Sequence, residues 1–191
     1  MSGQGTPVDS QFRWSDFGWI ALFVALLIGA GFGLRDPWPA DEPRFASLAR
    51  DMVASGDWLI PRVGGDLYQD KPPLFFWLLA LSYSLFGSVK ASFLLPSLLA
   101  AFATCALVYD LARRLHGRAA GLAAALTLAC TLQFVQTMRG AQIDPTLLAL
   151  CTLSLWALGR HLLLGPAWGL CFLGGVAAGL GVVTTGGGFL P

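Results

Sequence analysis

Residues 35–73 read RDPWPADEPRFASLARDMVASGDWLIPRVGGDLYQDKPP and differ in composition from the apolar chain around them. Seven of the chain's 11 acidic residues lie in this stretch: Asp36, Asp41, Glu42, Asp51, Asp57, Asp66 and Asp70. Five of its 12 basic residues lie there too: Arg35, Arg44, Arg50, Arg62 and Lys71. Charges are costly in apolar surroundings, so a hydrophobic protein that gathers them in one loop uses that loop for more than anchoring. We therefore interpret the stretch as part of a catalytic site at a membrane surface.

The composition of the whole chain is typical of a membrane protein. Its 191 residues are 55% hydrophobic and 12% charged, with a mean hydropathy of +0.65, whereas soluble domains are about 25% charged. Apolar runs close to the length of a bilayer span recur along the chain, which predicts an all-α polytopic membrane protein. No basic cluster resembles a nucleic-acid-binding patch. The four cysteines lie inside apolar runs, so we expect neither a disulfide nor a metal site.

The apolar runs predict about five transmembrane helices. Residues 1–16 form a cytoplasmic tail, 17–34 the first span, 35–91 an outer loop with juxtamembrane amphipathic helices, and 92–185 four further spans. The sequence stops at Pro191, directly after an apolar run and a glycine cluster. We therefore interpret the chain as the N-terminal part of a longer transmembrane domain.

The run Leu74–Phe86 leaves two topologies open, because its length is ambiguous for a span. If it lies in the interface, Arg13, Arg113, Arg114, Arg118 and Arg160 are inside, and outside the shared loop only Lys90 and Arg139 are on the outer face. If it crosses, the segments after it change sides and only Arg13, Lys90 and Arg139 are inside. The excess of basic residues in cytoplasmic loops favours the interfacial helix. That topology places Asp144 on the same outer face as Asp41.

A helix of about 13 residues is predicted within the charged loop. Its apolar residues recur at helical spacing: Phe45, Leu48, Ala49, Met52 and Val53. Asp41 is a plausible N-cap, and Ser55-Gly56-Asp57 a plausible end. The helix is too short to span a bilayer, and we expect it to lie flat on the membrane.

Several motifs occur in a fixed order: D-E-x-R at residues 41–44, S-G-D-W-x-x-P-R at 55–62, an acidic residue followed by K-P-P at 70–73, and I-D-P at 143–145. The series closely resembles the bacterial polyprenyl-phosphate-dependent membrane glycosyltransferases. These include the lipid A aminoarabinose transferases and the protein O-mannosyltransferase-like enzymes. The resemblance covers roughly residues 14–185. The chain departs from the family pattern at Thr185, where the family usually has a lysine.

The resemblance implies a GT-C type fold in the bacterial inner membrane, with its active loop on the periplasmic face. The donor would be a sugar on a polyprenyl phosphate, drawn from among the membrane lipids, and the acceptor lipid A, a glycolipid or a protein. No cofactor is implied, and a divalent metal has no support in the sequence. Matched to the family's motifs, Asp41 and Asp144 are the candidate catalytic residues, and Arg44, Lys71, Asp70 and Glu42 are the candidate substrate-binding residues.

These residue types suit glycosyl transfer from a lipid phosphate. The leaving phosphate is anionic and has to be held by cations. The acceptor hydroxyl is a weak nucleophile that a carboxylate base activates by about 10²–10⁴-fold. The alternative is a non-catalytic membrane protein, either a truncated inactive remnant or part of a transporter. Transporters place charged groups within their spans, and the spans here are nearly free of charge.

Overall fold

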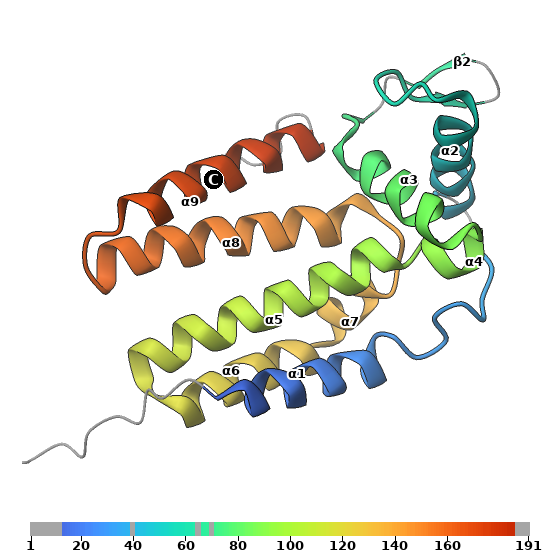
Figure 1. Cartoon of the computed structure of the whole chain (residues 1–191). Coiled ribbons are helices and arrows are strands. Elements are labelled where there is room, and N and C mark those ends of the chain that lie inside the picture. Colours follow the sequence, from blue (N-terminus) through green and yellow to red (C-terminus); the bar gives the residue numbers. More distant parts are fainter. Residues whose placement is uncertain (1–12, 39–40, 64–65, 69–70, 186–191) are drawn as a thin grey trace, which may run out of the picture.

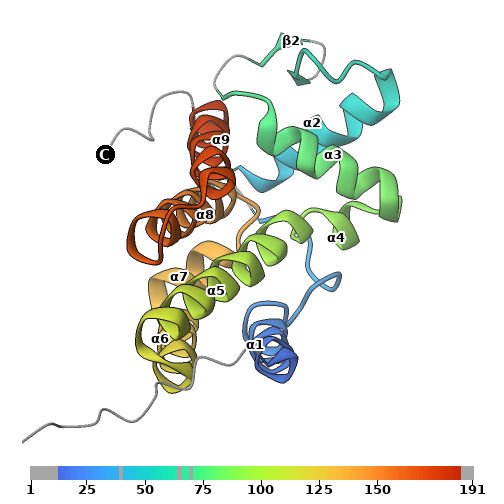
Figure 2. The same cartoon turned by 60° about the vertical axis from the view of Figure 1, so that its left-hand side comes forward.

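The computed structural model describes residues 13–38, 41–63, 66–68 and 71–185. A bundle of roughly side-by-side helices carries a smaller cluster of elements at one end (Figure 1). The bundle helices are α1 (Trp14–Leu27), α5 (Leu95–His116), α6 (Arg118–Cys130), α8 (Ile143–Leu163) and α9 (Trp168–Thr185), with the short α7 (Leu132–Met138) between α6 and α8 along the chain. The end cluster holds α2 (Glu42–Ser55), α3 (Leu74–Phe86), α4 (Val89–Ser92) and the antiparallel strands β1 (Arg62–Val63) and β2 (Asp66–Leu67). The same grouping appears when the molecule is turned (Figure 2).

Among the described residues, three helical segments are long and apolar enough to cross a membrane: Val89–His116, which comprises α4 and α5, Ile143–Leu163 and Trp168–Thr185. A fourth segment qualifies if α6 and α7 count as one span, although the pair is bent by 67°. These four segments correspond to the four spans expected within residues 92–185. Helix α1 is apolar but has only 14 residues, or about 21 Å at about 1.5 Å per residue. The total of five spans therefore stays a prediction.

Helix α1 differs in its bounds from the predicted first span. It begins at Trp14 and ends at Leu27, whereas the apolar run continues to Leu34. The chain after Leu27 turns, and Gly31 and Gly33 have φ angles of 87° and 75°. These left-handed conformations do not continue a helix, and glycine adopts them at little cost. Apolar composition alone does not report where such a helix ends.

Helix α2 confirms the predicted amphipathic helix of the charged loop. Its buried apolar residues are Phe45, Ala46, Leu48, Ala49 and Met52. It ends at Gly56, whose φ of 73° is the left-handed conformation of many helix C-termini. Asp41 is the N-cap residue of α2, as predicted, but its side chain makes no capping hydrogen bond. The carboxylate of Asp41 instead binds the side chain of Arg44.

The buried side chains form two separate cores. One belongs to the end cluster and consists of Phe45, Leu48, Ala49, Met52, Phe75, Phe76, Leu79, Ala80, Phe93, Leu94, Ala141 and Ile143. The other lies in the bundle, between α1, α5, α6 and α7, and includes Val24, Ala101, Cys105 and Tyr109. The first core contains Ala141 from the α7–α8 turn and Ile143 from the start of α8. The end cluster is therefore packed onto the α7–α8 turn, residues 139–142, as well as onto itself.

Helix α3 is a member of the end cluster. Phe75, Phe76 and Leu79 are buried against α2, where Phe45 meets Phe75 and Phe76 with ring centroids 5.8 and 5.4 Å apart. Its 13 residues extend about 20 Å, short of the roughly 30 Å of a bilayer core. Both observations agree with a juxtamembrane helix.

Ion pairs join the helices at the opposite end of the bundle. The carboxylate of Asp16 accepts hydrogen bonds from Arg118 at 2.7 and 2.8 Å and from the Tyr109 hydroxyl at 2.6 Å, which ties α1 to α5 and α6. Asp110 pairs with Arg113 and Arg114 within α5, each at 2.7 Å. The indole of Trp156 in α8 also donates to Asp110. Most of the basic residues outside the charged loop are thus at the end away from α2.

A labelling experiment tests this arrangement. His116 and Gln142 are both exposed and lie at opposite ends of the bundle. In a variant without Cys105, Cys130, Cys151 and Cys171, we expect a cysteine at His116 to react with an impermeant maleimide only from the cytoplasm, and one at Gln142 only from outside. Labelling of both positions from one side would contradict the topology.

Candidate active site

Asp41 and Arg44 form an exposed ion pair at the start of α2. Arg44 Nη2 lies 2.6 Å from Asp41 Oδ1, and the two side chains are 42% and 47% exposed. The Arg44 guanidinium also lies over the ring of Tyr68, 5.4 Å from its centroid. An exposed pair of this kind contributes only about 0–1 kcal/mol, so a bound substrate replaces it at little cost. Both predicted residues are therefore open to solvent and next to each other.

Lys71 lies in a segment that packs against the same helix. The Tyr68 ring contacts Phe76 edge-on at 5.5 Å, and Phe76 in turn contacts Phe45. Lys71 is between these two anchoring aromatics in the sequence and is exposed. Among the described residues it has neither a hydrogen-bond nor an ion-pair partner. The predicted neighbour Asp70 falls outside the described residues.

Asp144 occupies the first turn of α8 and is exposed. Ile143 and Pro145 on either side of it are buried, so the backbone at this point is fixed while the carboxylate faces out. Gln142 precedes the helix with extended backbone angles. The position is that of a carboxylate presented at a helix N-terminus, close to the α7–α8 turn.

Glu42 is the buried acidic residue of the site. Its side chain is 8% exposed and forms a two-pronged ion pair with Arg35, with distances of 2.7 Å (Nη1 to Oε2) and 2.8 Å (Nη2 to Oε1). Oε2 also accepts from the backbone N–H of Trp38 at 2.7 Å. Oε1 accepts from the backbone N–H of Ala141 at 2.8 Å. Both carboxylate oxygens therefore have partners within the protein, although the sequence predicted that Glu42 binds substrate.

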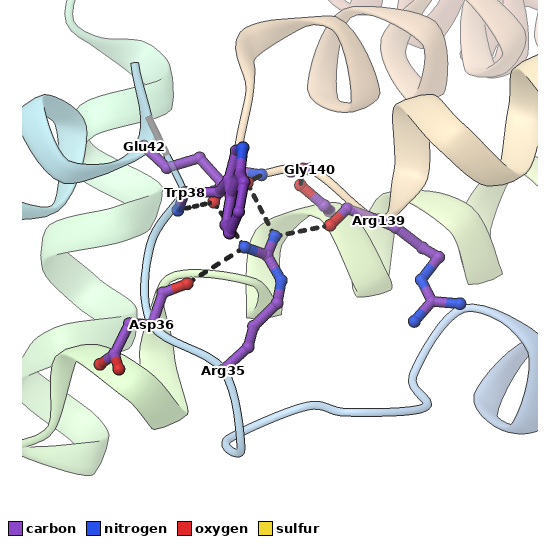
Figure 3. A network of polar contacts seen from close by, with 8 residues as sticks. Arg35, Asp36, Trp38, Glu42, Arg139 and Gly140 are labelled. Carbon is purple, nitrogen blue, oxygen red and sulfur yellow. Dashed lines mark hydrogen bonds and ion pairs between the residues drawn. The ribbon is translucent and has the colours of Figure 1, made fainter. Parts of the chain in front are cut away.

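Further hydrogen bonds hold the charged loop to the α7–α8 turn (Figure 3). Arg35 Nη2 donates to the carbonyl of Arg139 at 2.9 Å. Ser97 Oγ, on α5, donates to the carbonyl of Gly140 at 2.6 Å. The guanidinium of Arg139 donates to the carbonyl of Ala30, which follows α1, at 3.0 Å. The loop that carries Asp41 and the turn that leads to Asp144 are thus in direct contact at one end of the bundle.

Sequence reasoning did not identify Arg35, Ser97 or Arg139 as parts of this network. Arg35 is one of several loop charges, and Ser97 is an ordinary polar residue within an apolar helix. The available signal was the pattern around Glu42. An acidic residue at the start of an amphipathic helix and next to its buried stripe needs a cationic partner. The sequence does not show which arginine supplies it.

The network lowers the pKa of the Glu42 carboxyl. Burial by itself raises this pKa, but the hydrogen bonds from Arg35 and from the Trp38 and Ala141 amides outweigh it, so the pKa lies below its ordinary value of 4.5. The hydrogen bonds with Glu42 raise the pKa of Arg35. Glu42 and Arg35 are therefore a charged pair at neutral pH. Among the described residues, no group of three or more histidine, cysteine, aspartate or glutamate side chains is arranged to hold a metal ion.

Comparisons with known proteins show the family of the chain. Residues 70–186 match the family model described as dolichyl-phosphate-mannose-protein mannosyltransferase, which is more than half of the chain. The chain belongs to this mannosyltransferase family. The membership confirms the resemblance seen in the motifs.

Several relatives of the chain are named as arabinosyl transferases. The undecaprenyl phosphate-alpha-4-amino-4-deoxy-L-arabinose arabinosyl transferase 2 of Sodalis glossinidius (strain morsitans) is 32% identical over 171 residues, covering 87% of this chain and 31% of that protein. The transferase of Edwardsiella ictaluri (strain 93-146) is 32% identical over 176 residues, covering 88% of this chain and 32% of that protein. The chain thus spans about a third of the length of these relatives.

A solved structure shows the same fold. The crystal structure of ArnT from Cupriavidus metallidurans bound to undecaprenyl phosphate superposes with a TM-score of 0.81 at 26% identity, covering 88% of this chain and 32% of that one. The match confirms the predicted all-α, GT-C type membrane fold.

The ion pair of Glu42 makes the stability of the site dependent on pH. Because the folded-state pKa lies below 4.5, the stabilisation from this carboxylate is complete above that pH and is lost as the pH falls through the folded-state value. We expect the thermal unfolding temperature to drop more steeply below pH 4.5 in the unmodified protein than in Glu42→Gln, which has no carboxyl to titrate. Parallel curves for the two proteins would disprove the assignment. Asp36→Asn, in an exposed part of the same loop, should follow the unmodified curve.

Proposed function

We propose that the chain forms part of the active site of a membrane glycosyltransferase that moves a sugar from a polyprenyl phosphate to an acceptor hydroxyl. The observation that carries the proposal is the contact between the charged loop and the α7–α8 turn. It brings the segments of Asp41, Arg44 and Asp144 together at one end of an apolar bundle. The names of the relatives, and the undecaprenyl phosphate bound to ArnT, support a polyprenyl-phosphate donor.

The roles follow from the charges of the exposed side chains. Asp41 accepts the proton of the acceptor hydroxyl as its oxygen attacks the anomeric carbon. The bond between that carbon and the phosphate oxygen breaks, and polyprenyl phosphate leaves as an anion. Lys71 and Arg44 bind the phosphate and stabilise its charge. Asp144 orients the acceptor from the facing turn, and direct displacement inverts the configuration at the anomeric carbon.

An apolar groove on the buried face of α8 suits the polyprenyl chain of the donor. It has a volume of about 320 Å³ and lies between α3, α5 and α8, lined by Leu78, Leu81, Leu85, Leu95, Leu99 and Leu150 among others. Thr146 lines it as well and belongs to the same first turn of α8 as Asp144. A lipid lying there from the bilayer would bring its phosphate to the end of the bundle at which α8 begins. We favour lipid A as the acceptor, because the motifs resemble those of the lipid A aminoarabinose transferases.

The distribution of basic residues supports an outward-facing site in the inner membrane. Outside the long charged loop, Arg13, Arg113, Arg114, Arg118 and Arg160 lie at the far end, against Lys90 and Arg139 at the site end. Positive residues concentrate on the cytoplasmic side of membrane proteins. The site end would then face the periplasm. The likeness to transferases also disfavours the alternative of a transporter part.

Replacing the base tests the reaction. In the full-length protein, Asp41→Asn should reduce sugar transfer by about 10²–10⁴-fold, because the acceptor hydroxyl loses its proton acceptor. Membrane expression should be unchanged, because Asp41 is half exposed and makes no capping bond. Turnover of a lipid-linked sugar by purified protein is the measurement. Asp36→Asn is the matched control, and normal turnover in Asp41→Asn would remove the assignment.

Replacing the cations tests phosphate binding. Lys71→Met and Arg44→Met should each weaken the binding of undecaprenyl phosphate by about tenfold or more, the size of a lost charge-assisted hydrogen bond. Arg50→Met is the control, since Arg50 is an exposed arginine of the same helix that pairs only weakly with Asp51 at 3.6 Å. Equal losses in all three variants would indicate general attraction of the anion to the basic loop.

A further inference from the structure

The α7–α8 turn is held by its backbone. Three successive residues in it, Arg139, Gly140 and Ala141, each bind a distant side chain through a peptide group. Two carbonyls accept, from Arg35 and from Ser97, and one amide donates to Glu42. Their partners are 104, 43 and 99 residues away along the chain. Peptide groups that lie outside helices and strands need other partners where water does not reach them, and here side chains provide that pairing.

Glu42 is the centre of this arrangement and is saturated. Its two oxygens accept four hydrogen bonds, two from Arg35 and one each from the Trp38 and Ala141 amides. A carboxylate has about four acceptor positions. No acceptor position is left for a sugar hydroxyl. The side chain is also 8% exposed, against 47% for the neighbouring Asp41.

Asp41 depends on Glu42 for its place. Among the described residues, the polar partner of the Asp41 side chain is Arg44, which is itself half exposed. Its position is therefore set by the backbone at the start of α2, and Glu42 is the first residue of that helix. The carboxylate of Glu42 ties this backbone to the amide of Ala141, three residues before Asp144 in the sequence.

We infer that Glu42 is a positioning residue, which fixes the spacing between Asp41 and Asp144 by clamping the loop to the α7–α8 turn. The inference rests on the proposed function, in which both aspartates act on one acceptor. The two-pronged pair with Arg35 fixes direction as well as distance, because the planar guanidinium meets both carboxylate oxygens. Arg35 carries the clamp on to the Arg139 carbonyl, so both residues bind the same turn.

Kinetics separate positioning from substrate binding. In the full-length protein, Glu42→Gln keeps the shape of the side chain but loses the paired charge. We expect kcat to fall by about 100-fold, the effect of a displacement near 1 Å in an active site. The KM for the lipid donor should stay within about twofold. Ser97→Ala, which cuts the same clamp from α5 and leaves Glu42 intact, should lower kcat in the same direction by less.

A distance measurement tests the clamp without using activity. Spin labels at Arg50 on α2 and Leu148 on α8 are both at exposed positions and report the separation of the two segments. We expect Glu42→Gln to broaden this distance distribution in folded, monodisperse protein. Lys90→Ala is the matched control for both measurements. It removes an exposed ion pair with Asp36 in the same end cluster, 2.9 Å long, which does not reach the turn.

The outcomes are distinct. A broadened distance with a lowered kcat supports the inference. An unchanged kcat per folded protein overturns it, as does a lowered kcat with an unchanged distance, which would mean that Glu42 acts on the substrate directly. If Glu42→Gln does not fold, Ser97→Ala decides by the same two measurements. If the unmodified protein transfers no sugar, the proposed function fails, and the distance still decides whether Glu42 holds the two segments together.

Discussion

The carboxylate of Glu42 is buried at the junction of the end cluster and the bundle, and the geometry of this whole end depends on it. A charge removed from water costs several kcal/mol unless donors replace the lost solvent, and removal of one member of such a pair costs about 3–5 kcal/mol. Arg35 and two backbone amides provide those donors. Because two of the four bonds come from peptide groups, the interaction constrains where the main chain lies as well as which side chains meet.

The two hydrophobic cores explain why such a polar junction is needed. The bundle core binds α1, α5, α6 and α7 to one another, and the end core binds α2 to α3 and to Ile143 at the start of α8. Apolar packing has no fixed direction, so it does not by itself set the angle of the end cluster on the bundle. The hydrogen bonds of Arg35, Glu42 and Ser97 are directional and lie where the cores meet. They leave the exposed carboxylates and cations free for a ligand, while the residues beneath them are fixed.

Much of this arrangement was predictable, and the failures have physical causes. The amphipathic stripe of α2 and its end at Gly56 follow from local spacing and from the conformation that glycine favours. The juxtamembrane character of α3 follows from the shortness of its apolar run, which has 13 residues. The end of α1 could not be predicted from the sequence, because Gly31 and Gly33 lie within a run as apolar as the helix. Nor was the bond from the Ala141 amide to Glu42 predictable, because a pairing across 99 residues leaves no periodic signal. Asp41 has the residue type of a cap, but its carboxylate binds the Arg44 side chain and makes no hydrogen bond to the helix backbone.

The way in which the α7–α8 turn is gripped has an evolutionary consequence. Arg35, Glu42 and Ser97 all contact main-chain atoms of residues 139–141, and every residue type other than proline offers the same amide and carbonyl. Substitutions in the turn that keep its shape would therefore leave the grip intact, whereas the three side chains that provide it have few substitutes. Homologous proteins could therefore differ in the residue types of the turn, and so in the surface around Asp144, while keeping the same backbone position for the catalytic residues.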